Sequence, residues 1–149
     1  MTAIAPHSEP HLPSPAENPS GEIVIYDGHC KFCTASVQKL ARWDRAGRLS
    51  FLSLHERDVA TRFPQLTYDQ LMEEIYLVDR RGRIHRGAEA FRYLTRRIPR
   101  LFALAPLLHI PFTLPFWRWA YRQIARRRYR LLGKTDQACD DGNCKIHFK

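Results

Sequence analysis

Acidic residues are absent from a long stretch of this chain. Between Phe91 and Thr135 there is no Asp or Glu, whereas the same stretch holds ten Arg and Lys134. These sum to eleven positive charges, and the whole chain of 149 residues has a formal net charge of +9, so the remainder sums to −2. The basic character therefore belongs to the C-terminal third of the chain.

The chain also lacks an uninterrupted apolar stretch that is long enough to cross a membrane. Residues 101–117 carry no formal charge, but they include three prolines and fall short of the ~20 residues that a spanning helix needs. We therefore expect no transmembrane helix. Two interpretations of this run remain open: helical packing against the core, or a surface that touches a membrane or a partner.

Cysteines are few, and a secretory signal is missing. Four cysteines in 149 residues are too few for a fold held together by disulfides. The first 21 residues contain no Lys or Arg and no apolar run, but they contain five prolines. We therefore predict a disordered tail over residues 1–21 and a cytoplasmic protein, in which most thiols stay reduced.

Two of the four cysteines stand where a predicted strand is followed by a predicted helix. Residues 23–26 form a continuous apolar run of the kind found in a buried parallel strand, and a short turn separates them from Cys30 and Cys33. Apolar residues then recur with helical spacing on the face of Cys33: Val37, Leu40 and Ala41. This pattern predicts a C-x-x-C motif at the N-terminal end of a helix over 31–46.

That position favours ionisation of a thiol. The first N–H groups of a helix have no partner within the helix, and the helix dipole adds partial positive charge. Both stabilise a thiolate at Cys30, and His29 and Lys31 add positive charge nearby. We predict that Cys30 is the more exposed and more acidic thiol, which attacks a disulfide. Cys33 would then be the buried thiol with a raised pKa, which resolves the mixed disulfide.

Other chemistry is compatible with the same spacing. A C-x-x-C pair is also half of a zinc site, or two incidental cysteines on a buried face. Cys139 and Cys144 near the C-terminus, with His147, would supply further ligands, although their distance along the chain gives no spacing support. The strand before the motif and the helix after it favour a redox pair, so we expect no metal and no cofactor.

The remaining pattern predicts an α/β fold. Further strands are expected at 49–54, 75–78 and 83–85, and further helices at 55–72, broken near Pro64, and at 88–98. This βαβαββα order is that of a thioredoxin-like core, with a right-handed βαβ unit, a hairpin and a helix. We assign the core to residues 22–98, a basic and apolar helical extension to residues 99–134, and a cysteine-containing tail to residues 135–149.

The extension ends in a predicted arginine-rich helix over residues 116–132. Basic amphipathic helices bind anionic lipid or nucleic acid, and more often their charges form a solvated face. No nucleic-acid-binding motif accompanies this helix, so nucleic acid is not expected. An anionic membrane surface is the candidate docking partner, which would place a cytoplasmic protein at the membrane periphery.

The residues around the C-x-x-C motif resemble a known family. The segment from Asp27 to Cys33 is similar to the Asp-x-x-Cys-x-x-Cys signature of the DCC family of thiol–disulfide oxidoreductases. Weaker similarity runs from about Glu22 to Cys139 and includes the turn at 79–82, the helix start at 87–90 and the stretch 128–130 with Gly133. The resemblance implies a thioredoxin-like fold, a redox role for both cysteines, and a protein or small-molecule thiol or disulfide as substrate.

Asp27 is the third signature residue, and two roles are open to it. It would cap the helix or fix the turn through its carboxylate, or it would transfer a proton to or from Cys33 as the mixed disulfide is released. Thioredoxins also carry a proline just before the third strand, where this chain has Met72-Glu73-Glu74. We therefore predict a thiol–disulfide oxidoreductase with altered substrate docking. The alternative is a binding module that uses the cysteines for zinc and the arginine-rich helix for docking.

Overall fold

The computed structural model describes residues 11–132, and its elements follow the predicted order. Four strands form one sheet: β1 (Glu22–Tyr26), β2 (Leu49–Ser53), β3 (Tyr76–Val78) and β4 (Ile84–Arg86). They lie in the order β2-β1-β3-β4, with β1 parallel to β2 and antiparallel to β3, and β4 antiparallel to β3. This arrangement confirms the thioredoxin-like α/β fold.

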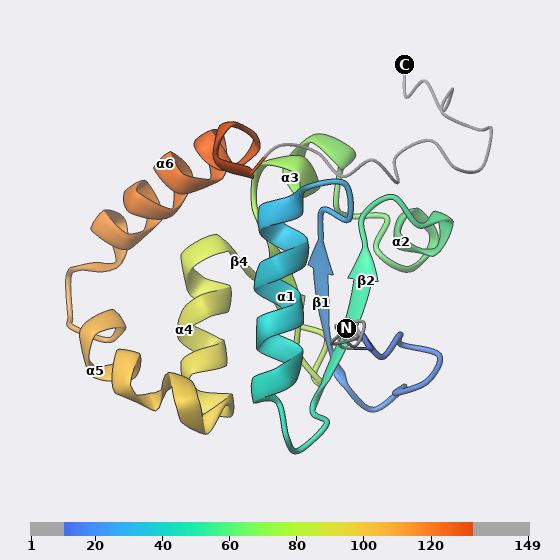
Figure 1. The fold of residues 1–149 in the computed structure, drawn as a ribbon, viewed down its shortest axis with the longest axis horizontal. Helices are drawn as coiled ribbons and strands as arrows, with labels where there is room; N and C mark the ends of the chain where they lie inside the picture. Colours follow the sequence, from blue (N-terminus) through green and yellow to red (C-terminus); the bar gives the residue numbers. More distant parts are fainter. Residues whose placement is uncertain (1–10, 133–149) are drawn as a thin grey trace, which may run out of the picture.

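Helices cover both faces of this sheet (Figure 1). One face packs against α1 (Lys31–Trp43) and α4 (Gly87–Arg97), and the other against α2 (Arg57–Arg62) and α3 (Tyr68–Glu73). Because successive side chains of a strand point to opposite faces, β1 supplies both cores. Val24 packs with the α1 and α4 side, and Ile25 packs with the α2 and α3 side.

The structure confirms one predicted helix break and shortens the first helix. The helix expected over 55–72 is interrupted near Pro64 as predicted: α2 ends at Arg62, and α3 begins with a capping box in which Thr67 and Gln70 bond reciprocally. The helix expected to reach residue 46 ends at Trp43, because the Asp44 carboxylate accepts the N–H of Leu49 at 2.8 Å and turns the chain into β2. Polar side chains that bond to the backbone at these turns therefore set the helix boundaries, which apolar spacing alone does not reveal.

The segment before β1 is ordered over residues 11–21, so the prediction of disorder is wrong there. Phe51 donates its N–H to the carbonyl of Pro13 at 2.8 Å. Asn18 donates to the carbonyl oxygens of Gly47 and Leu49, and Ser50 donates to the carbonyl of Asn18 at 2.6 Å. β2 is an edge strand, and this segment occupies backbone groups that would otherwise face solvent. Residues 1–10 and the predicted tail over residues 135–149 lie outside the described part.

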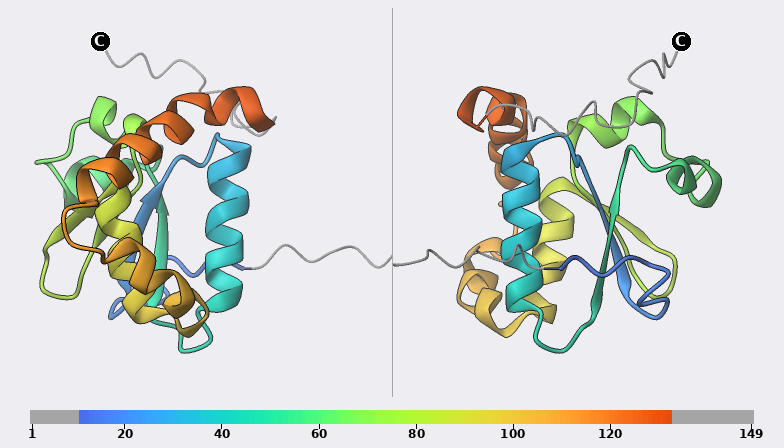
Figure 2. Two further views of the ribbon diagram at one scale, coloured as in Figure 1. Left: turned by 90° about the vertical axis from the view of Figure 1, so that its left-hand side faces the viewer. Right: turned by 45° about the vertical axis from the view of Figure 1, so that its right-hand side comes forward.

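The C-terminal extension consists of η1 (Pro99–Leu104), α5 (Ala105–Leu108) and α6 (Leu114–Leu132), which lie along one side of the molecule (Figure 2). The expected packing of residues 101–117 against the core holds for Leu101, whereas most of the large apolar side chains that follow are exposed. Among the described residues, no helix is both long enough and apolar enough to span a membrane. α6 is fixed to the sheet by Tyr121, whose hydroxyl accepts the N–H of Ile75 at 2.9 Å.

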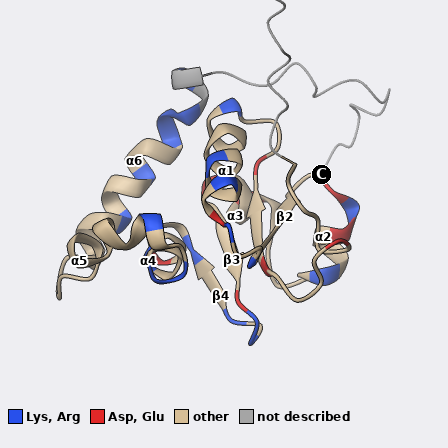
Figure 3. Cartoon of the chain, turned by 60° about the horizontal axis from the view of Figure 1, so that its bottom comes forward, with Lys and Arg blue, Asp and Glu red and all other residues tan. Residues whose placement is uncertain are grey.

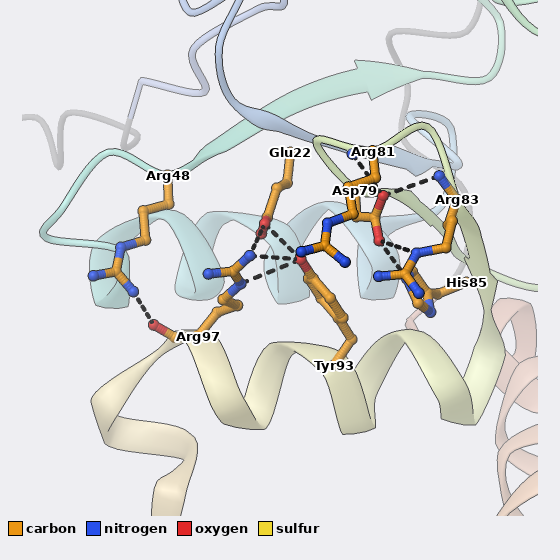
Figure 4. Close-up of polar contacts among 8 residues, drawn as sticks. All are labelled: Glu22, Arg48, Asp79, Arg81, Arg83, His85, Tyr93 and Arg97. Carbon is orange, nitrogen blue, oxygen red and sulfur yellow. Dashed lines mark hydrogen bonds and ion pairs between the residues drawn. The ribbon is translucent and has the colours of Figure 1, made fainter.

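A buried polar network joins α4 to the end of the sheet that lies away from the cysteines (Figure 4). Glu22 accepts a hydrogen bond from the Tyr93 hydroxyl at 2.6 Å and pairs with Arg97 at 2.8 Å. At the hairpin turn, Asp79 accepts the backbone N–H groups of Arg81 and Arg83 and contacts the side chains of Arg83 and His85. Although burial raises the pKa of Asp79, these hydrogen bonds and charges lower it overall, to about 2.

Candidate functional site

The C-x-x-C motif lies at the end of β1, in a turn that requires glycine at one position. A Cβ on Gly28 would lie 2.6 Å from the Ser53 hydroxyl oxygen, so the turn approaches β2 too closely for a side chain. The carboxylate of Asp27 accepts the N–H of His29 at 3.0 Å, and Cys30 donates its N–H to the carbonyl of Asp27 at 3.2 Å. The first part of the motif is thereby fixed before α1 begins.

Cys30 is the N-cap residue of α1, as its predicted position at the helix start requires. Its sulfur accepts the N–H of Cys33 at 3.4 Å, and its own backbone is extended. Asp27, which we had considered as the cap, instead fixes the preceding turn through His29. A sulfur at this position receives both a hydrogen bond and the positive end of the helix dipole.

The predicted order of exposure of the two thiols is wrong. Cys30 is 0% exposed, whereas Cys33, one turn further along α1, is partly exposed. Helical spacing correctly placed Cys33 on the face of Val37 and Leu40, but it gave no information on what covers the turn itself. The expected direction for Cys33 does hold: burial and the neighbouring Cys30 raise its pKa to about 12. Cys33 therefore stays protonated at neutral pH.

The carboxylate of Asp27 is fully buried beside the cysteines and has partners on both of its oxygens. His55, just after β2, contacts Oδ1 through Nε2 at 2.8 Å. Arg128, on α6, lies 3.7 Å from Oδ2. The carboxyl ends of parallel strands meet at one edge of a sheet, which explains why the residues that follow β1 and β2 come together here.

Aromatic rings pack around this carboxylate. The ring of His29 stacks on that of His55, with centroids 3.7 Å apart and an interplanar angle of 12°. Tyr68 lies edge-on to His55 at 6.0 Å. Burial and the negative charge of Asp27 raise the pKa of Tyr68, so its hydroxyl remains protonated and Asp27 is the acidic group of the cluster.

Arg128 connects the C-terminal helix with the thiols. Arg128 is buried, with only 5% of the residue exposed. Its Nη1 lies 3.6 Å from the sulfur of Cys33. Nη2 donates to the carbonyl of Met72, just before β3. The positive charge lowers the pKa of Cys33 and so opposes part of the raising effect of burial. One buried cation therefore contacts a thiol, a carboxylate and the segment that precedes β3.

That segment also borders a cavity of about 350 Å³ between α3 and α6. Its lining includes Met72, Glu73 and Glu74 from the end of α3, and Arg122, Ala125, Arg126 and Arg128 from α6. Thioredoxins carry a proline at this point of the chain, and no cis peptide bond occurs among the described residues here. Side chains of α6 thus occupy the neighbourhood where a thioredoxin-like protein would present that proline.

Within residues 11–132, no group of three or more His, Cys, Asp or Glu side chains is arranged to hold a metal ion. Cys139, Cys144 and His147 lie outside this range. What the described groups offer is thiol chemistry: a sulfur at a helix N-terminus, a second thiol one turn away, and a buried Arg–Asp pair beside it.

Sequence reasoning singled out Cys30, Cys33 and Asp27, and the structure brings these three residues together. It missed His55 and Arg128. His55 could have been found, because it directly follows the second predicted strand and that strand ends beside the motif. For Arg128 the one signal was the family resemblance over 128–130, which gave it no role, since Arg128 is one of several arginines on α6 and is separated from Cys33 by 95 residues.

The chain is similar to a known family and to a plant protein. The sequence model of the family described as DCC1-like thiol-disulfide oxidoreductase matches residues 24–134. An uncharacterized chloroplastic protein of Arabidopsis thaliana is 30% identical over 77 residues, which cover 50% of this chain and 36% of the plant protein. The match thus spans only about a third of that relative. No solved structure matches the chain.

Proposed function

The chain belongs to the DCC1-like thiol-disulfide oxidoreductase family, and from this premise we propose that Cys30 and Cys33 form its redox pair. The observation that carries the proposal is the hydrogen bond from the N–H of Cys33 to the sulfur of Cys30 at the start of α1. It puts the two thiols within one helical turn, and it places one of them where a thiolate is stabilised. The substrate would be a thiol or disulfide of a protein or a small molecule.

The proposed reaction has two exchange steps. The Cys30 thiolate attacks a substrate disulfide, so that a Cys30–substrate disulfide forms and one substrate sulfur leaves as a thiolate, which takes up a proton. Cys33 then loses its proton and attacks the sulfur of Cys30. The intramolecular disulfide forms and the second substrate sulfur leaves, so the substrate gains two electrons and the cysteine pair loses two. An external dithiol returns the pair to its reduced form, and the reverse sequence would oxidise a dithiol substrate.

Two charged side chains support the second step. Cys33 must ionise although its pKa is about 12, and the guanidinium of Arg128, 3.6 Å from its sulfur, favours the charged form. Asp27 holds that guanidinium and also binds His55. We assign Asp27 the organisation of this end of the site and the role of proton acceptor, and Arg128 the stabilisation of the Cys33 thiolate.

Substrate access in this proposal runs past Cys33. Cys30 is buried, whereas Cys33 is partly exposed, and the cavity lined by Met72 and Arg128 lies on the same side. Docking along α3 and α6 would replace the proline-dependent docking of thioredoxins. Movement of the groups over Cys30 would then be part of the first exchange step.

The proposal is tested with a variant in which Cys139 and Cys144 are replaced by Ser, mixed with a small aromatic disulfide. In that background, Cys30→Ser should abolish exchange. Cys33→Ser should accumulate a mixed disulfide on Cys30, visible by mass spectrometry, because no second thiol resolves it. Exchange that survives loss of Cys30 would refute the proposed roles.

Structural zinc is the competing use of the cysteines, and metal analysis separates it from redox chemistry. Full-length protein purified without chelator should contain far less than one zinc per chain if the redox assignment is right. About one equivalent of zinc that is lost on Cys30→Ser would favour the binding module instead.

A further inference from the structure

Exposed apolar side chains are concentrated in one part of the chain. Of the nine large hydrophobic residues that are at least 38% exposed in the described structure, eight lie between Phe102 and Ile124. Seven of them form what we call the apolar edge: Phe102, Leu104, Leu107, Ile110, Phe112, Phe116 and Trp119. They belong to η1, α5, the turn after α5 and the start of α6. Scattered exposed apolar residues are normal, but a grouping of this kind marks an interaction site.

Phe112 is the extreme case. Its side chain is 98% exposed, and its φ of 68° lies in the left-handed region, which aromatic residues rarely adopt. Thr113 fixes the turn, since its hydroxyl donates to the carbonyl of Ile110 at 2.7 Å. The fold thus accepts an unfavourable backbone conformation at a position that holds a large apolar ring in solvent. No contact within the described residues explains why an aromatic ring stands at this exposed position.

The apolar edge continues into a basic surface on α6. The inner face of this helix carries Trp117, Tyr121 and Arg128, which are partly or fully buried. The outer face begins with the exposed rings of Phe116 and Trp119. Arg127 and Arg130 each follow one of these rings by eleven residues, or about three turns, and are exposed on the same face. Figure 3 shows basic positions along α6 and no acidic ones.

We propose that the apolar edge inserts into the interface of an anionic membrane and that arginines on the outer face of α6 bind the lipid headgroups. Exposed aromatic and aliphatic side chains beside a cationic helix face are the features of interfacial membrane-binding segments. The segment from Phe91 to Thr135 contributes no Asp or Glu that would repel such a surface, and the acidic side chains that reach α6, Glu89 and Glu74, pair with Arg118 and Arg122. This docking does not depend on the thiol chemistry.

A second copy of the chain suits this face less well. A symmetric contact would bring the same arginines of two molecules together, and like charges across an interface oppose association. Arg128, which contacts Cys33, lies on the inner face of α6, whereas the lipid-binding Arg127 and Arg130 lie on its outer face. α6 begins beside α5 and ends next to the N-terminal end of α1, so the edge and Arg128 lie at opposite ends of the helix (Figure 1).

Vesicle flotation of the full-length reduced protein tests this proposal. Two kinds of vesicle are compared: phosphatidylcholine alone, and an equal mixture of phosphatidylcholine and phosphatidylglycerol. Phe112→Asn removes the apolar tip and keeps the turn, because Asn tolerates the left-handed conformation. Arg127→Gln with Arg130→Gln removes two charges from the outer face of α6. Arg57→Gln with Arg62→Gln removes two exposed charges from α2, on the opposite side of the molecule, and is the matched control.

The wild type should float with the anionic vesicles and remain unbound with phosphatidylcholine alone. Phe112→Asn and the α6 pair should each weaken binding about tenfold or more, and the α2 pair should bind like the wild type. Circular dichroism of each variant checks that the fold is kept. The proposal is overturned if the wild type does not bind anionic vesicles, if Phe112→Asn binds equally well, or if both arginine pairs lose binding equally. A wild-type dimer that Phe112→Asn dissociates would assign the edge to a second copy and would also overturn it.

Discussion

Removal of the Arg128 charge should slow the reaction of Cys33, and the structure gives the size of the effect. At the observed 3.6 Å between Nη1 and the sulfur, with an effective dielectric of about 20, the attraction between guanidinium and thiolate is about 4–5 kcal/mol. This corresponds to about three pKa units. Cys33 is partly exposed, and solvent screens much of that attraction, so Arg128→Met should raise the pKa of Cys33 by about one unit.

The assay needs a variant in which the pKa of Cys33 is low enough for its thiolate to be followed against pH. Cys30 is replaced by Ser, because the hydrogen bond and charge of Cys30 are among the causes that raise the pKa of Cys33. Cys139 and Cys144 are replaced as well, so that Cys33 is the sole thiol. The rate of alkylation by iodoacetamide is then followed against pH by mass spectrometry. Below the pKa the rate follows the thiolate fraction, so one unit appears as an about tenfold slower reaction.

Two further variants make the interpretation specific. Arg128→Lys keeps the positive charge and should react nearly as fast as the parent. Asp27→Asn should act in the opposite direction and speed alkylation, because the charge of Asp27 raises the pKa of Cys33. If Arg128→Met leaves the rate unchanged or increases it, or if Asp27→Asn slows the reaction, the electrostatic account of Arg128 and Asp27 is wrong.

Two predictions concern stability. The pKa of Asp79 is lowered to about 2 from an ordinary 3.8, so its contribution is fully present above pH 3.8 and is lost as pH falls toward 2. Asp79→Asn should therefore cost about 2 kcal/mol in urea unfolding at neutral pH, and a difference of that size that persists at pH 2 would contradict this. Tyr121→Phe leaves the N–H of Ile75 without its acceptor and should cost about 1–3 kcal/mol, whereas Tyr26→Phe, which loses no described hydrogen bond, should cost less than about 0.5 kcal/mol. Equal costs for the two tyrosines would show that the bond to Ile75 does not anchor α6.

Local patterns in the sequence predicted most of the fold. The apolar run at 23–26, the helical spacing after Cys33 and the turn at 79–82 each depend on neighbouring residues, and together such patterns predicted the βαβαββα order of the elements. The length of α1 was overestimated, because side chains such as Asp44 end a helix through hydrogen bonds that apolar spacing does not reveal.

The candidate site was predictable only in part, for a physical reason. Cys30, Cys33 and Asp27 lie within seven consecutive residues, so their proximity follows from one strand–turn–helix unit. The same unit does not reveal that Cys30 is fully buried in the folded chain, and the expected exposure was therefore wrong. Arg128 reaches the thiols through the packing of α6 on α1, and apart from the family resemblance over 128–130 no local pattern distinguishes it from Arg126 or Arg127.

The order of residues 11–21 has the same origin. Five prolines within residues 1–21 and the lack of an apolar run there are typical of a disordered tail, and the sequence alone offers no contact for it. In the folded protein, β2 is an edge strand whose backbone groups bond to Pro13 and Asn18. Hydrogen bonds to β2, rather than the conformational preferences of its own residues, order this segment.

The most direct test of the central proposal is a redox titration of the protein in which Cys139 and Cys144 are replaced by Ser, read by mass spectrometry. We predict a reversible loss of two hydrogens that maps to a Cys30–Cys33 disulfide and disappears in both single-cysteine variants. If the two thiols remain unbridged even under strong oxidant, Cys30 and Cys33 are not a redox pair.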